Sequence, residues 1–185
     1  MGVCILGLSL AGTAAGQAPT GTQVNPTAAD LAEFQKRLDG YMALHDKAAS
    51  GLSTPGKEAT PAEIVNYQRQ LEARLVPLRT SAKAGDIFSP EMQAFIRKYL
   101  AQLFSGPQGA NLKGVVMDEN PVDVKFGVNT RYPDTVPLST MPAQVLEALP
   151  KLPEGLEYRF IGRDLILMDV RAHTIVDFVR DAIPA

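Results

Sequence analysis

The chain has 185 residues, of which 45% are hydrophobic and 21% are charged, and its formal charge is −2. Basic and acidic side chains are interspersed along it, so it lacks the basic stripe that binds a nucleic-acid backbone, and no nucleic-acid partner is expected. Cys4 is the only cysteine, which excludes a disulfide within the chain and a zinc site built from cysteines. No glycine-rich phosphate loop or metal-ligand spacing occurs, so we expect no cofactor and no bound metal.

The amino-terminal segment predicts export. No charged residue precedes Asp30, residues 2–10 are apolar except Ser9, and Ala14 and Gly16 supply the small positions of a cleavage site. We therefore expect a signal peptide over 1–16 and a periplasmic or secreted protein. The apolar run is shorter than the ~20 residues that span a bilayer, so no stable membrane span is expected after processing. No basic residue precedes this run, which leaves a cytosolic protein with an apolar tail as the alternative.

Residues 17–27 are polar, small and proline-bearing, which is typical of a flexible leader. Region 28–119 then shows apolar residues at spacings of three and four, which predicts helices. The first is expected to begin at Thr27 as its N-cap and to end near Gly51.

Two further helices have recognisable starts. Thr60 and Glu63 form a capping-box pattern around Pro61, and Ser89 precedes Pro90 in the same way. A late proline, Pro77, is expected to kink or end the second helix. A shorter fourth helix is indicated near residues 112–116, so the region should form a bundle of three to four helices.

Region 120–185 has a different character. Six of the fourteen prolines lie between residues 121 and 153, which excludes long regular elements there. Alternation over 122–128 predicts a half-buried strand, and Ser139 is expected to cap a short helix over 139–149. A three-stranded antiparallel β-meander is expected to follow, in an α+β fold. Its strands are Glu157–Ile161, Leu165–Val170 and Thr174–Val179.

The middle strand, LILMDV, is apolar on both faces. Each face of the sheet should therefore be covered. The short helix over 139–149 is the expected cover for one of them.

The segment PLSTMPAQVLEALPKLPEGLEYRFIGRDLILMDVRAHTIVDFVRDAIP resembles the carboxyl-terminal part of an uncharacterised family of exported bacterial proteins. FQKRLDGYMALHDKAA and KAGDIFSPEMQAFIRKYL resemble the helical half of the same family. This resemblance implies location and architecture, and it brings no activity. The hairpin YRFIGRDLILMDVRAHTIVDFV is also similar to exported modules of the RcnB type, which are associated with nickel and cobalt homeostasis. The chain has no histidine-rich or methionine-rich segment to match them, so no metal site is carried over.

The two histidines are candidate binding residues. His45 lies on the apolar face of the first helix, where it is either a metal ligand or general base, or a structural residue of the helix interface. No second ligand stands at helical spacing, which favours the structural interpretation. Asp46 is not expected to be its partner, because neighbours in a helix do not face each other. His173 lies in a turn and is interpreted either as a functional loop residue or as a solvated one.

Charged residues of the carboxyl-terminal region complete the set of candidates. Asp164, Asp169 and Asp177 form the best carboxylate cluster, and one register would place Asp169 opposite Asp177, about 5 Å away. Other registers separate them, and ordinary solvent-facing carboxylates are the alternative. Arg131 is expected either to pair with Asp134 or to lie in a loop fixed by proline.

The leading functional prediction is a non-catalytic binding or interaction module whose partner is another periplasmic or envelope protein. Its contact surface would be an apolar groove between the helices and the sheet, or the free edge of the meander. One alternative is a metal-handling or stress-related periplasmic protein that uses the histidines and aspartates. A second is a hydrolase that uses the hairpin carboxylates Asp169 and Asp177.

Overall fold

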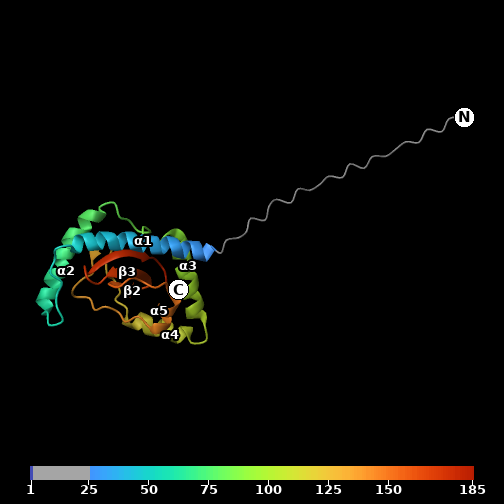
Figure 1. Cartoon of the computed structure of the whole chain (residues 1–185). Helices are drawn as coiled ribbons and strands as arrows, with labels where there is room; N and C mark the ends of the chain where they lie inside the picture. Colours follow the sequence, from blue (N-terminus) through green and yellow to red (C-terminus); the bar gives the residue numbers. More distant parts are fainter. Residues whose placement is uncertain (2–25) are drawn as a thin grey trace.

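The computed structural model describes Met1 and residues 26–185, and these form an α+β fold (Figure 1). The expected signal peptide over 1–16 and the leader as far as residue 25 lie outside the described residues. None of the described helices combines the length and apolarity that a membrane span requires.

The amino-terminal helices confirm most of the expected boundaries. Helix α1 (Pro26–Ala49) already includes Thr27, so the leader ends earlier than residue 27 and Thr27 is not the N-cap. Helix α2 (Pro61–Leu75) begins with the expected capping box, in which the Thr60 backbone N–H donates to the Glu63 carboxylate at 2.7 Å. Pro77 falls in a single 3₁₀ turn, η1 (Val76–Arg79), which ends the helix.

Helices α3 (Pro90–Ser105) and α4 (Gly109–Glu119) meet at a tight corner. The Ser89 hydroxyl caps α3 as expected by accepting the Met92 N–H at 3.3 Å. At the corner, a Cβ on Gly109 would lie 2.2 Å from the Phe104 carbonyl oxygen. Only glycine therefore allows the chain to turn this closely between the two helices.

The carboxyl-terminal half holds a four-stranded antiparallel sheet of order β1-β4-β3-β2 and one short helix, α5. The three meander strands are confirmed to within a residue at each end. Gly162, with φ +55°, opens the two-residue turn between β2 and β3. The bounds are β1 (Thr130–Arg131), α5 (Ala143–Ala148), β2 (Leu156–Ile161), β3 (Asp164–Asp169) and β4 (Thr174–Val179).

Two sequence predictions in this half are wrong. Residues 122–128 form no strand, because Pro121 and the left-handed Asp123 (φ 60°) break an extended path, and the sheet gains the two-residue β1 instead. Ser139 does not cap α5, which begins after Pro142; its hydroxyl donates to the Phe160 carbonyl at 3.3 Å.

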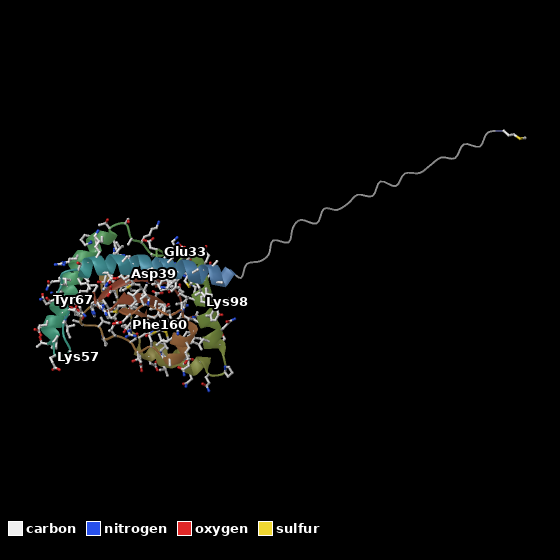
Figure 2. All side chains as sticks on the ribbon, viewed as in Figure 1. Glu33, Asp39, Lys57, Tyr67, Lys98 and Phe160 are labelled. Carbon is white, nitrogen blue, oxygen red and sulfur yellow. The ribbon has the colours of Figure 1, made fainter. Side chains whose placement is uncertain are left out.

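One face of the sheet, here called the helical face, packs against α1, α3, α5 and the segment before α3. Phe88 joins the layers by stacking on Phe34 of α1 at 5.6 Å and near Tyr158 of β2 at 6.4 Å between ring centroids. Phe160 is fully buried within these layers, whereas Glu33 and Lys98 lie on the outside (Figure 2).

The opposite face, here called the loop face, is covered by irregular chain. Val124, Phe126 and Val136 pack against the side chains of the sheet. Both faces of the middle strand are therefore covered, as its apolar sequence indicated, and α5 does cover one of them. The buried residues of this second cluster are Tyr132, Ile161, Ile166, Met168 and Ile175.

Part of the outer edge of strand β2 is hydrogen-bonded by its own chain. Ser139 binds the Phe160 carbonyl, the Leu156 N–H donates to the Pro153 carbonyl at 3.2 Å, and the Arg159 guanidinium covers the Tyr158 carbonyl at 3.3 Å. Such cover is a common protection against strand addition. Three of the outward-facing backbone groups of β2 are therefore already bonded within the chain.

Candidate functional site

The six sequence candidates do not converge. Arg131 and His173 lie at the surface beside α2, His45 and Asp169 lie between α1 and the sheet, and Asp164 and Asp177 lie in two further places.

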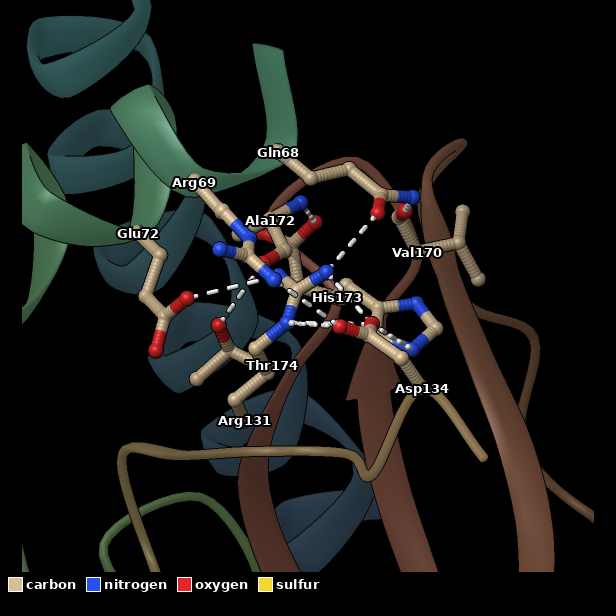
Figure 3. Close-up of polar contacts among 10 residues, drawn as sticks. Gln68, Arg69, Glu72, Arg131, Asp134, Val170, Ala172, His173 and Thr174 are labelled. Carbon is tan, nitrogen blue, oxygen red and sulfur yellow. Dashed lines mark hydrogen bonds and ion pairs between the residues drawn. The ribbon is translucent and has the colours of Figure 1, made fainter. Parts of the chain in front are cut away.

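Arg131 is the centre of a polar cluster where α2 meets β1 and the β3–β4 turn (Figure 3). Its guanidinium pairs with Asp134 at 2.7 Å and with Glu72 at 3.3 Å, and it also donates to the Gln68 side-chain oxygen at 3.2 Å. The expected Arg131–Asp134 pair is thus present. The bond from Arg131 lowers the pKa of the Asp134 carboxyl. Arg69 also pairs with Asp134, at 3.4 Å, so two arginines match two carboxylates. The cluster therefore fixes β1 to α2 and offers little charge to a ligand.

His173 belongs to the same cluster and is not a freely solvated turn residue. Its side chain is 16% exposed, its ring packs edge-to-face on Tyr132, and its Nε2 lies 3.6 Å from the Asp134 carboxylate. Burial, followed by the Arg131 charge, lowers the pKa of the imidazole below its ordinary value. With φ 54°, His173 also supplies the left-handed residue of the turn.

His45 is buried against Asp169, as the structural interpretation proposed, but its surroundings were not foreseen. Its Nε2 lies 3.6 Å from Asp169, and its Nδ1 lies 3.3 Å from Asp46, the neighbour that was expected to point away. The Tyr41 hydroxyl donates to Asp169 at 2.6 Å. Burial and the Asp169 charge raise the pKa of Tyr41 well above its ordinary value, so the hydroxyl remains a donor.

Asp169 and Asp177 serve different backbone segments. Asp169 pairs with Thr174 in the sheet and accepts the N–H groups of Arg171 and Ala172, both at 2.9 Å, so it organises the turn. The tight turn over residues 170–173 aligns Asp169 with Thr174, and a bulge in β4 then places Asp177 opposite Leu167. The register that would have brought the two carboxylates together is therefore not formed.

Asp177 anchors the loop before α3. Its carboxylate accepts backbone N–H groups from Gly85 at 3.0 Å, from Ile87 and Phe88 at 2.8 Å, and from Phe178. Burial raises the pKa of Asp177, although these four donors oppose the shift. The Asp177 side chain is fully buried.

Arg79 is a buried residue that sequence reasoning missed. It is 6% exposed, donates to the Asn129 side chain at 2.6 Å and to the Val176 carbonyl at 3.2 Å, and lies over the Tyr41 ring at 4.8 Å. An arginine in the turn after a helix carries no pattern that distinguishes a buried side chain from a solvated one. Its contacts join the turn after α2 to the sheet.

The last candidate, Asp164, pairs with Arg180 at 2.6 Å at the end of the sheet. Arg180 in turn covers the Phe126 and Phe178 rings. Across residues 26–185, no three histidine, cysteine, aspartate or glutamate side chains gather closely enough to hold a metal ion.

A hollow of about 650 Å³ lies where α3, α4 and α5 meet, and it is here called the α4–α5 hollow. Leu103, Leu112 and Val115 supply its apolar surface together with Pro107 and Pro142. No charged side chain lines it. The tight corner at Gly109 creates this hollow by folding α4 back beside the end of α3.

Four amide side chains surround this apolar surface: Gln102, Gln108, Asn111 and Gln144. All four residues are exposed, and within the described chain none of these amides has a side-chain hydrogen-bond partner. An amide offers both a donor and an acceptor. The arrangement can therefore pair with the backbone of an incoming peptide while apolar side chains occupy the centre.

Comparison of the chain with protein families, with curated proteins and with solved structures finds no match.

Proposed function

We propose that this chain is an exported, non-catalytic binding module. Its α4–α5 hollow receives an uncharged, partly apolar segment of another periplasmic or envelope protein. The lining of the hollow is the observation that supports this proposal, because it contains no charge although 21% of the chain is charged.

The size and chemistry of the hollow fit such a ligand. Ligand pockets span about 300–1,000 Å³ and combine an apolar lining with a few placed polar groups. A charged segment would lose its hydration here and gain no opposite charge, which selects against it. An uncharged segment buries its aliphatic side chains and satisfies its peptide groups on the amides.

Binding is tested by selecting peptides from a random displayed library on the full-length protein and measuring their affinities by calorimetry. Selected peptides should be poor in charged residues, and Val115→Asp should weaken them about tenfold or more, because it places a charge in the apolar centre. Val122→Asp is the matched control, since Val122 is 62% exposed, Val115 is 46% exposed, and only Val115 lines the hollow.

Failure to select any binder, or binders indifferent to Val115→Asp, would overturn the binding proposal. Export is tested separately on protein isolated from its host's envelope. Its intact mass should correspond to a chain beginning at Gln17; an unprocessed cytosolic chain would contradict export.

A further inference from the structure

A second hollow of about 650 Å³ lies between the 51–59 loop and one face of α2, and it is here called the α2 hollow. Helix α2 is at the opposite end of the molecule from α4 (Figure 1). In contrast to the α4–α5 hollow, its lining is rich in polar groups that differ in kind. Hydroxyls come from Ser53 and Thr54, and amides come from Asn66 and Gln70.

Both ends of this hollow are fixed. Arg74 donates to the Ser50 carbonyl at 2.9 Å, which holds the start of the loop to α2. At the other end, the Thr60–Glu63 capping box fixes the point where the loop enters the helix. A site held in this way loses little conformational entropy when a ligand binds.

The α2 residues of the hollow share one side of the helix. Asn66 and Gln70 are four positions apart, as are Glu63 and Tyr67, so successive turns direct these side chains toward the loop. Asn66 and Gln70 are exposed, and neither side chain makes a hydrogen bond to another described residue. Their donors and acceptors are available to a ligand.

The charges of the hollow disfavour ions of either sign. The carboxylates of Glu58 and Glu63 would repel an anionic ligand, and the guanidinium of Arg74 would repel a cationic one. The bonds from the Thr60 backbone and hydroxyl lower the pKa of Glu63, which keeps it ionised at neutral pH. A ligand that uses all of these groups needs many donors and acceptors and no net charge.

We propose that the α2 hollow binds a neutral saccharide. Each sugar hydroxyl both donates and accepts, so it can bond to carboxylate, amide and guanidinium groups in turn. Leu52 and Pro55, which are half-buried and line the hollow, supply apolar contact for the C–H groups of a sugar ring. This site shares no residue with the α4–α5 hollow, so the two proposals succeed or fail independently.

The test is a titration of the ¹⁵N-labelled full-length protein with neutral trisaccharides of glucose, galactose, mannose and N-acetylglucosamine. At least one should shift the backbone resonances of residues 51–59 and of the Asn66–Gln70 turn. The Asn66→Ala/Gln70→Ala double variant should weaken that binding about tenfold or more, the loss expected for two hydrogen bonds. The matched control is Gln108→Ala/Gln144→Ala, which removes two amides from the other hollow and should leave saccharide affinity unchanged.

Inorganic phosphate and spermidine serve as ionic comparison probes. The proposal is overturned if no trisaccharide shifts these resonances up to about 10 mM, where even a millimolar Kd would be saturated. It is also overturned if either ion binds the same residues more tightly than every trisaccharide. Because all four substituted residues are exposed, the spectrum of each variant verifies that its fold is intact.

Discussion

The two faces of the sheet are covered in different ways. The helical face is covered mainly by helices whose apolar stripes and caps are evident in the sequence. The loop face is covered by residues 121–138, which contain only the two-residue strand β1. In that segment Val124 and Phe126, two positions apart, both pack against the sheet, but neither belongs to a strand that pairs with it. Alternation therefore reports which side chains are buried, and it does not by itself report a hydrogen-bonded strand.

The largest expected change in stability comes from substituting one residue of each face. Leu167→Ala opens a cavity in the fully buried helical face and should lower the free energy of unfolding by about 3 kcal/mol. Phe126→Ala removes a half-buried ring and should lower it by roughly half as much, because the irregular chain can collapse into the space. Urea denaturation of both variants measures the difference.

Hydrogen exchange sharpens the same contrast. Phe126→Ala should increase exchange mainly in residues 121–138, whereas Leu167→Ala should increase it throughout the sheet and α1. Equal losses with the same exchange pattern would show that the two faces form one cooperative unit and that the distinction is only geometric.

The second test asks how far the helical face depends on a polar anchor. Asp177→Asn replaces one carboxylate oxygen with an NH₂ group, which cannot accept the backbone N–H groups of the loop before α3. Leaving buried donors unmatched should lower stability by about 2 kcal/mol. Asp181→Asn is the control, because Asp181 is exposed. An unchanged unfolding midpoint in Asp177→Asn would mean that apolar packing alone holds the loop.

The smallest expected effect is a pH dependence of stability caused by His173, whose ring packs on Tyr132 of the loop face. Its pKa is lowered in the folded protein, so the unfolded chain binds a proton more readily. Stability should therefore fall as pH decreases through 6.5, the ordinary pKa of histidine. His173→Asn, which tolerates the same left-handed backbone, should show a shallower fall between pH 7 and pH 5. Parallel curves for the two proteins would contradict this assignment.

Local signals predicted much of this fold. The caps at Thr60 and Ser89 use side chains that bond within three residues, and the turn at Gly162 depends on one backbone conformation. Such features depend only on a few residues that are close together in the sequence. The class and order of the elements could be predicted for the same reason.

The sites depended on contacts that the sequence does not specify. His45 and Asp169 could be singled out, but their meeting required the packing of α1 on the sheet. The turn over residues 170–173 sets the register that separates Asp177 from Asp169, and no glycine or proline in that turn marked which register would form. The α4–α5 hollow combines amide side chains from α3, α4, α5 and the corner before α4, and no pattern within one element marks such a set.

The hydrogen bond between Tyr41 and Asp169 affects when the chain can fold during its synthesis. These residues are 128 positions apart, and Asp177 lies 90 positions beyond the Ile87 amide that it holds. A ribosome delivers the first helix long before the last hairpin. Helix α1 therefore emerges without its polar partner and cannot complete its native contacts until residues 164–179 have been made. Such distant pairings slow folding, so the newly made chain should stay loosely organised until its final strands close the structure.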